Sequence, residues 1–215
     1  MSATARSIPE LVMAWGRGRA VSRLTPQPTP VEGGFQADVG IPSRQIRQVF
    51  HTYTPDSLAA LAERWSAADR QIMIAGPSET LREAMPSTWT MDPAGHLMVT
   101  DFAPARVTVP DSYRLTLETE GDLTIARAHY VTGDLAASAR LGRTEAIGVF
   151  DKVVTDPKHQ RRGLGSTLMR ALSNHALGLG MSEGLLVGSD EGRALYEHLG
   201  WTRVADFPGA CSKGD

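Results

Sequence analysis

The chain has 215 residues, with 22 Lys or Arg against 24 Asp or Glu, so its formal net charge is −2. This length predicts one large domain or two small ones, and the charge balance argues against whole-protein attraction to nucleic acid or to a membrane. A single cysteine, Cys211, excludes a disulfide framework and favours a reducing, cytoplasmic compartment. We find no apolar run near the roughly 20 residues of a membrane span and no cleavable signal pattern.

The first 30 residues predict an N-terminal arm. A short helix is expected over 8–15, ended by the two glycines of Trp15-Gly-Arg-Gly-Arg19. Arg17, Arg19 and Arg23 form a small basic cluster, which we interpret as a solvated strip, with an anion or substrate contact as the alternative. Alternating prolines from 26 to 30 predict an extended connector.

Residues 31–110 predict alternating strands and helices. Strands are expected over 35–39, 46–53, 71–75, 89–91 and 96–102, and helices over 54–65 and 78–85. The helix that starts at Thr54 has a proline in its first turn and apolar residues at helical spacing.

Residues 111–215 predict an antiparallel meander followed by helices. Strands are expected over 113–119, 123–131, 135–141 and 146–155, separated by short turns such as Gly121-Asp122 and Gly133-Asp134. An amphipathic helix over 163–179, a strand over 185–187, a helix over 191–199 and a strand over 201–207 complete the chain.

The segment from Val153 to Ser166 carries the clearest chemistry. A strand ends near Thr155, Asp156-Pro157 predicts a turn, and a glycine-containing loop leads into the helix. Unpaired N–H groups and the helix dipole at such an N-terminus bind phosphate, and glycines allow a close approach. The residues that we expect to contribute are Gln160, Arg161, Arg162, Gly163, Leu164, Gly165 and Ser166.

Two motifs in this order resemble those of the general-control-related N-acetyltransferases, the GNAT superfamily. Gln160-x-x-Gly163-x-Gly165 is similar to the family's pyrophosphate loop, and Ala194-Leu-Tyr-Glu-His-Leu-Gly-Trp201 resembles its second signature. The resemblance covers residues 149–207 and extends from 113. It implies an α/β (α+β) fold with a mixed, mostly antiparallel sheet flanked by helices, and acetyl-CoA as the acyl donor.

The resemblance also implies roles for individual residues. Backbone groups of Val153, Val154 and Thr155 would bind the acetyl carbonyl and the pantetheine arm, and Tyr196 would be the general acid for the departing thiolate. Asp151 would act as the base, directly or through water, with a merely exposed strand carboxylate as the alternative. Ser189 stands where many relatives have an asparagine.

The chain departs from the family between its first two meander strands, where two helices that wall the acceptor pocket are replaced by Glu120-Gly-Asp122. The first half is the candidate for this wall. Its order of elements predicts a degenerate copy of the fold, with Thr54-Pro-Asp-Ser57 in place of a phosphate loop and thus no second donor site. We therefore divide the chain into an arm (1–30), a degenerate GNAT-like region (31–110) and a GNAT domain (111–215).

The function expected from these observations is direct transfer of an acetyl group from acetyl-CoA to a primary amine of a small molecule or peptide. One alternative is a GNAT-fold transferase with another acyl donor, either a longer acyl-CoA or an aminoacyl-tRNA. Another is a non-catalytic acyl-CoA sensor. A homodimer is possible by analogy with relatives, no metal site is expected, and the sequence does not identify the acceptor.

Overall fold

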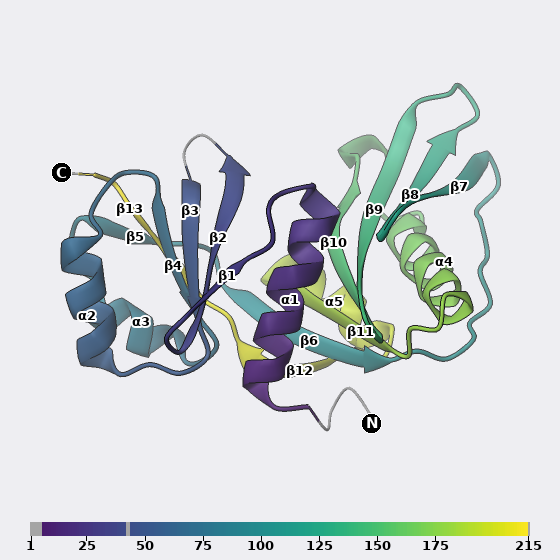
Figure 1. Cartoon of the computed structure of the whole chain (residues 1–215). Helices are drawn as coiled ribbons and strands as arrows, with labels where there is room; N and C mark the ends of the chain where they lie inside the picture. Colours follow the sequence, from purple (N-terminus) through teal and green to yellow (C-terminus); the bar gives the residue numbers. More distant parts are fainter. Residues whose placement is uncertain (1–5, 42–43, 215) are drawn as a thin grey trace.

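Two twisted sheets lie side by side in the molecule (Figure 1). The structure is a computed structural model, and it describes residues 6–41 and 44–214. The first sheet contains β1 (Thr29–Val31), β2 (Gly34–Ile41), β3 (Arg44–Phe50), β4 (Arg70–Ile74), β5 (Trp89–Met91) and β13 (Gly209–Ser212). The second contains β6 (Gly95–Asp101), β7 (Tyr113–Glu120), β8 (Leu123–Tyr130), β9 (Leu135–Thr144), β10 (Ile147–Thr155), β11 (Glu183–Ser189) and β12 (Thr202–Asp206).

Five α-helices and a short 3₁₀ turn connect and cover these sheets in the described part of the chain. They are α1 (Ile8–Arg23), α2 (Pro55–Arg64), α3 (Ser78–Ala84), η2 (Pro157–His159), α4 (Leu164–Gly178) and α5 (Asp190–His198). Every helix and strand that the sequence predicts is present, and the ends differ by a few residues except at the C-terminal end of α1. The mixed α/β fold class is therefore confirmed.

The six strands of the first sheet follow the order of six strands of the second, in which β7 is an additional edge strand. Each sheet is completed by a strand from the other half of the chain. The orders are β1-β2-β3-β4-β13-β5 and β12-β6-β11-β10-β9-β8-β7. In each sheet a crossover helix joins a parallel pair, β3 with β4 and β10 with β11. Strand β13 inserts antiparallel between β4 and β5, and β6 inserts in the same way between β11 and β12. The sheets therefore do not divide at residue 110.

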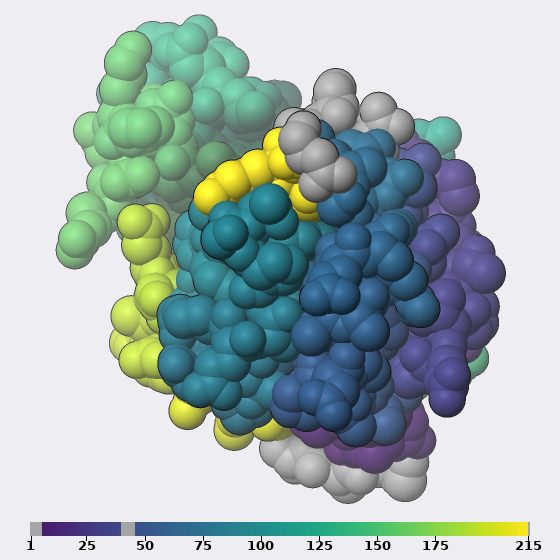
Figure 2. All heavy atoms as spheres, turned by 90° about the vertical axis from the view of Figure 1, so that its left-hand side faces the viewer, coloured from purple at the N-terminus to yellow at the C-terminus, as the bar shows by residue number. Residues whose placement is uncertain are grey.

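Strand β1 begins inside the extended connector that the sequence predicts, where no strand is expected. Nor does the sequence predict strand β13, because the residues around Cys211 are mostly small and polar. It forms ladder bonds with β4 and β5, and Ala210 is fully buried between them. In Figure 2 the C-terminal residues, in yellow, lie against the blue and teal surface of the first half. A four-residue strand has too few residues to show a hydrophobic period, so only its place in the sheet makes it recognisable.

Helix α1 is twice as long as predicted and continues through Trp15-Gly-Arg-Gly-Arg19. A capping box between Ser7 and Glu10 starts it. Its glycines are sites of close packing: a β-carbon on Gly18 would lie 2.3 Å from the Val149 side chain, and one on Gly142 of β9 would lie 2.0 Å from the Gly18 carbonyl oxygen. The expectation that these glycines end the helix is wrong, because packing against the sheet outweighs their low helix propensity.

Helices α1 and α4 cover opposite faces of the second sheet. The side chains of β10 alternate between them, so that Phe150 packs in the core beneath α4 and Val149 in the core shared by α1 and both sheets. Helix α1 thus lies beside β9 and β10 (Figure 1), and it comes from the first half of the chain, the predicted source of the missing wall. None of the described helices is both long and apolar enough to cross a membrane.

Candidate active site

Strand β10 leaves its parallel neighbour halfway along its length. It pairs with β11 from Ile147 to Phe150, and the pairing with β11 stops there. A bulge between Asp151 and Val154 follows, with Lys152 at a φ of 49°, and β10 then pairs only with β9. The backbone of residues 151–155 therefore has a free edge on the side of β11. This edge contains the three residues predicted to bind the acyl and pantetheine groups.

The loop after β10 leads into α4, whose N-terminus is open. Gly163, the N-cap of α4, has a φ of 80° and makes no side-chain capping bond, and a β-carbon there would meet no atom within 4 Å. The N–H groups of the next three residues, 164–166, have no acceptor within the helix. Arg161 and Arg162 are both exposed beside them. Unpaired donors, the helix dipole and two cations fit a pyrophosphate.

The predicted loop residues have separate surroundings. The Leu164 side chain is buried under the sheet, so only its backbone faces the loop. The Arg162 side chain donates to the Tyr113 hydroxyl (3.1 Å) and to the Lys158 carbonyl (3.2 Å). Tyr113 in turn bonds the His159 ring at 2.9 Å. No local signal in the sequence points to Tyr113, because β7 is far from the loop in the chain and only the sheet brings them together.

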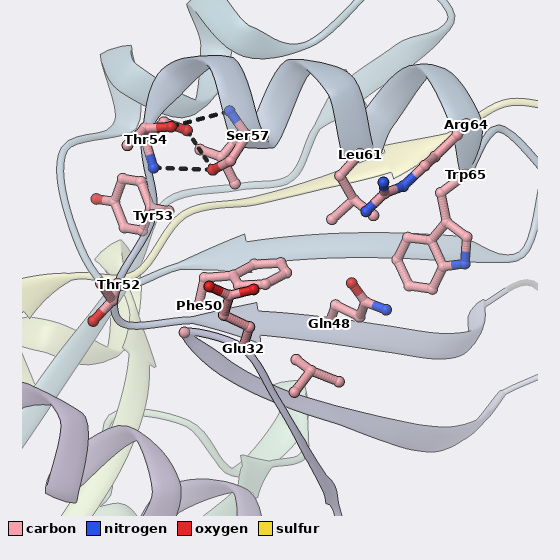
Figure 3. Close-up of a pocket in the computed structure, with 13 residues that line it drawn as sticks. Glu32, Gln48, Phe50, Thr52, Tyr53, Thr54, Ser57, Leu61, Arg64 and Trp65 are labelled. Atoms are coloured by element: carbon pink, nitrogen blue, oxygen red, sulfur yellow. Dashed lines mark hydrogen bonds between the residues drawn. The ribbon is translucent and has the colours of Figure 1, made fainter.

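The N-terminus of α2, which holds the corresponding place in the first sheet, is closed by its own side chains. The Ser57 N–H donates to the Thr54 hydroxyl oxygen at 3.1 Å, and the Thr54 N–H donates to the Ser57 hydroxyl oxygen at 3.0 Å, as the dashed lines in Figure 3 show. Asp56 adds a negative charge in the first turn. The capped N–H groups and the negative charge of Asp56 both oppose anion binding at this helix.

A pocket of about 760 Å³ lies between α2 and strands β1 to β3 (Figure 3). Phe50, Leu61 and Trp65 form its apolar walls, and Gln48 and Arg64 are among its polar groups. It lies on the first sheet, away from the β10 edge.

Tyr196 projects from α5 into the core beneath α4. Its ring packs against Gly188 and Gly192, where a β-carbon would come within 2.8 Å and 3.0 Å of it, and against Trp201 at 6.2 Å between ring centres. The residue is 8% exposed. Burial, reinforced by the charge of Asp151, raises the pKa of Tyr196 to about 12, so its hydroxyl is protonated near neutral pH. Ser189 caps this helix by accepting from the Gly192 N–H at 3.2 Å.

Asp151 is paired with α1. Its carboxylate accepts two bonds from the Arg23 guanidinium, at 2.6 and 2.9 Å, and one from the Ser22 hydroxyl at 2.7 Å. Burial alone would raise the pKa of Asp151, but these bonds and the charge of Arg23 outweigh it and lower the pKa to about 2. The alternative of a merely exposed carboxylate is wrong. Such a pKa also makes Asp151 a weak proton acceptor near neutral pH.

Comparison with known proteins agrees with this geometry. Residues 121–203 match the family described as the acetyltransferase (GNAT) domain. A mycothiol acetyltransferase from Clavibacter sepedonicus is 32% identical over 94 residues, which are 44% of this chain and 31% of that protein. The aligned region is therefore less than a third of that relative.

Solved structures resemble both sheets together. A GCN5-related N-acetyltransferase from Kribbella flavida has a TM-score of 0.67 at 13% identity, over 97% of this chain and 98% of that one. A tandem GNAT protein from the clavulanic acid biosynthesis pathway has a TM-score of 0.58 at 16% identity, over 85% and 79% of the two chains. At these identities the likeness is one of fold. Residues 121–203, which match the acetyltransferase (GNAT) domain, contain both the bulged strand and the open loop.

Proposed function

We propose that the protein transfers an acetyl group from acetyl-CoA directly to a primary amine. The observation that carries the proposal is the open N-terminus of α4 at the end of a strand with a free backbone edge, inside a GNAT domain. Bound acetyl-CoA would supply the activated acyl group. Division of the chain at residues 30 and 110, and descent of residues 31–110 from a second copy of the fold, remain predictions.

The chain's own residues would bind and orient the reactants. The loop 160–166 would hold the pyrophosphate through backbone N–H groups and the Arg161 and Arg162 side chains, and the backbone edge of Val153–Thr155 would align the acyl and pantetheine groups. Tyr196, protonated at neutral pH, would donate its proton to the leaving sulfur. Ser189 would contribute indirectly, by fixing the first turn of the helix that carries Tyr196.

We assign Asp151 a positioning role. Its carboxylate holds Arg23 and Ser22, and so fixes the end of α1 against the β10 bulge. The amine proton would then leave through water to solvent.

The test is calorimetric titration of the full chain with acetyl-CoA. Gly163→Glu places a carboxylate at the open helix N-terminus, and we expect it to weaken binding about 100-fold or more. Gly121→Glu is the matched control: that glycine also has a positive φ, 57°, and no atom within 4 Å of an added β-carbon, but it lies in the β7–β8 turn. Equal binding by the two variants would contradict the assigned loop.

Two other outcomes separate the alternatives. Binding of a longer acyl-CoA or an aminoacyl-tRNA, with none of acetyl-CoA, would replace the donor. Tight acetyl-CoA binding without transfer to any amine, unaffected by Tyr196→Phe, would indicate a sensor.

A further inference from the structure

In the described part of the chain, β7 is the strand of the second sheet that has no counterpart in the first. It pairs with β8 along its whole length, from Tyr113 opposite Tyr130 to Glu120 opposite Leu123. The first residue of this edge strand, Tyr113, contacts the loop that leads into α4. The open helix N-terminus therefore has a neighbouring strand that the closed N-terminus of α2 lacks.

The Tyr113 hydroxyl joins two residues of this loop. It accepts a hydrogen bond from the Arg162 guanidinium at 3.1 Å and lies 2.9 Å from Nδ1 of His159. Because the hydroxyl oxygen already accepts from Arg162, its O–H can donate to the Nδ1 of a neutral His159 ring. Arg162, Tyr113 and His159 thus form a continuous chain of hydrogen bonds between the loop and β7.

Ring packing holds the Tyr113 hydroxyl in place. The centre of the Tyr113 ring lies 5.7 Å from that of His159 and 5.3 Å from that of Tyr130, and the last two are 5.3 Å apart. The Tyr113 side chain also packs against the core beneath α4. A half-buried ring with these neighbours has little freedom to move, so the position of its hydroxyl is fixed by the sheet.

The 3₁₀ turn η2 supplies a second oxygen to Arg162. The Lys158 carbonyl accepts from the Arg162 guanidinium at 3.2 Å. Asp156 fixes this turn, because its side chain accepts from the Lys158 N–H at 2.9 Å and its carbonyl accepts from the His159 N–H at 2.8 Å. The two bonds to Arg162 use two of the five N–H donors of a guanidinium, so the other donors remain available to a ligand.

Arg161 has different surroundings. It has a φ of 60° and an exposed side chain, which makes no hydrogen bond or ion pair within the described residues. An anion that binds Arg161 must therefore order a long, unrestrained side chain, which costs conformational entropy. Arg162 directly precedes the N-cap Gly163 and is already ordered by its two bonds, so it loses less entropy on binding.

We propose that Tyr113 is a positioning residue for the acyl donor: its hydroxyl holds the Arg162 guanidinium beside the open N-terminus of α4, ready for the pyrophosphate. The inference rests on the proposed function, because acetyl-CoA is the molecule that supplies the pyrophosphate. It gives the additional strand β7 a role in donor binding. It also means that Arg162 contributes more to donor affinity than Arg161, although both side chains are exposed.

The first test is calorimetric titration of the full chain with acetyl-CoA. Tyr113→Phe removes the hydroxyl and keeps the ring, and we expect it to raise the Kd about tenfold. Tyr130→Phe is the matched control, because it removes a hydroxyl from the neighbouring ring that makes no hydrogen bond within the described residues. The Kd of this control should stay within about twofold of the wild-type value.

Double variants distinguish positioning from packing. In an Arg162→Gln background, Tyr113→Phe should raise the Kd by less than about twofold, because the group that Tyr113 positions is gone. In an Arg161→Gln background, the full effect of about tenfold should remain. A loss of the same size in both backgrounds would overturn the proposal, since Tyr113 would then act on the fold and not through Arg162.

A second variant keeps the proposal testable if Tyr113→Phe does not fold. Arg162→Lys keeps the positive charge but loses the forked donors that reach the Tyr113 hydroxyl, the Lys158 carbonyl and a ligand together. We expect it to raise the Kd for acetyl-CoA about tenfold. Wild-type affinity in this variant would overturn the proposal.

Sodium pyrophosphate separates this proposal from the proposed function. Thermal unfolding of the full chain is followed in pyrophosphate and in sodium chloride at matched ionic strength. We expect pyrophosphate to raise the Tm of the wild type by about 2–4 °C over chloride, and that of Tyr113→Phe by at most about half as much.

The possible outcomes are distinct. Acetyl-CoA binding that is unchanged by Tyr113→Phe would overturn the positioning role and leave the proposed function standing. Failure of acetyl-CoA to bind would overturn the proposed function, and the response to pyrophosphate would still decide on Tyr113. Equal responses of the wild type and Tyr113→Phe to pyrophosphate, including no response in either, would then overturn the positioning role as well.

Discussion

Helices α2 and α4 follow corresponding strands of the two sheets, and they begin in opposite ways. Thr54 and Ser57 satisfy each other's backbone N–H groups at the start of α2, where Asp56 adds a negative charge. Gly163 leaves the first turn of α4 open, and two arginines stand beside it. The same topology therefore gives one closed and one open helix N-terminus, and a few side chains in the first turn decide which of them fits an anion.

The halves also differ at their second helix. Helix α5 carries Tyr196, whereas α3, in the corresponding place in the first sheet, has the sequence SETLREA without a tyrosine. If the open half holds the whole reaction, Tyr196→Phe should lower kcat about 100-fold or more and change the acetyl-CoA Kd less than threefold. Because the pKa of Tyr196 is about 12, its deprotonation should not limit activity below about pH 11. The rate of thiol release, measured across pH, gives kcat and its pH dependence. A kcat of the variant near that of the wild type would show that another group protonates the sulfur.

The contact that joins the halves at the bulge is the pair Arg23–Asp151. Asp151→Asn leaves a partly buried guanidinium without its counter-charge, so we expect a loss of about 2–4 kcal/mol in the free energy of unfolding. The pKa of Asp151 is lowered, so the pair stabilises the protein above about pH 4 and the stabilisation is lost as pH falls towards 2. Urea unfolding at pH 7 and pH 3 measures this.

The exposed pair Arg127–Glu118 is the control for the Asp151 prediction, because Glu118→Gln should cost less than about 1 kcal/mol. A cost for Asp151→Asn as small as that would mean that the bonds to α1 do not hold the helix in place.

Alanine substitutions at one glycine of α1 and at one glycine of α4 test how closely each helix packs at that position. Gly18→Ala forces a methyl group into Val149 and should destabilise the fold by about 1–3 kcal/mol. Gly178→Ala, in the last turn of α4 with no atom within 4 Å, should be neutral or stabilising by up to about 1 kcal/mol. Chemical denaturation of the two variants distinguishes these outcomes, and equal effects would contradict the close packing of α1 on β9 and β10.

Apart from the control substitutions, the smallest effect is expected at the closed helix N-terminus of α2. Thr54→Ala removes one capping bond from α2 and should cost about 1 kcal/mol. The acetyl-CoA affinity should stay the same, since the donor loop lies on the other sheet. Thermal unfolding and titration of the same sample test both statements; a change in affinity would mean that the first half takes part in donor binding.

Many of the helices and strands can be predicted from the sequence, because the patterns that indicate them span only a few neighbouring residues. The strand at 89–91, the meander from Tyr113 and the amphipathic helix before Leu179 follow from alternation, turn residues and helical spacing. The loop with Gly163 and Gly165 and the Leu-Tyr run with Tyr196 are short motifs, so the candidate donor site could be predicted from them. The pairing of Asp151 with Arg23 could not, because those residues are 128 positions apart.

The sequence by itself determined the order and type of the elements between residues 34 and 206 and the open loop before α4, since backbone propensities and capping act over a few residues. Tertiary structure alone decided that α1 continues through two glycines, that β6 and β13 exchange sheets, and that Arg19 is buried while Arg17 is exposed. Each of these outcomes depends on a surface supplied by a distant part of the chain. Packing free energy of that kind outweighs local preference and leaves no periodic mark in the sequence.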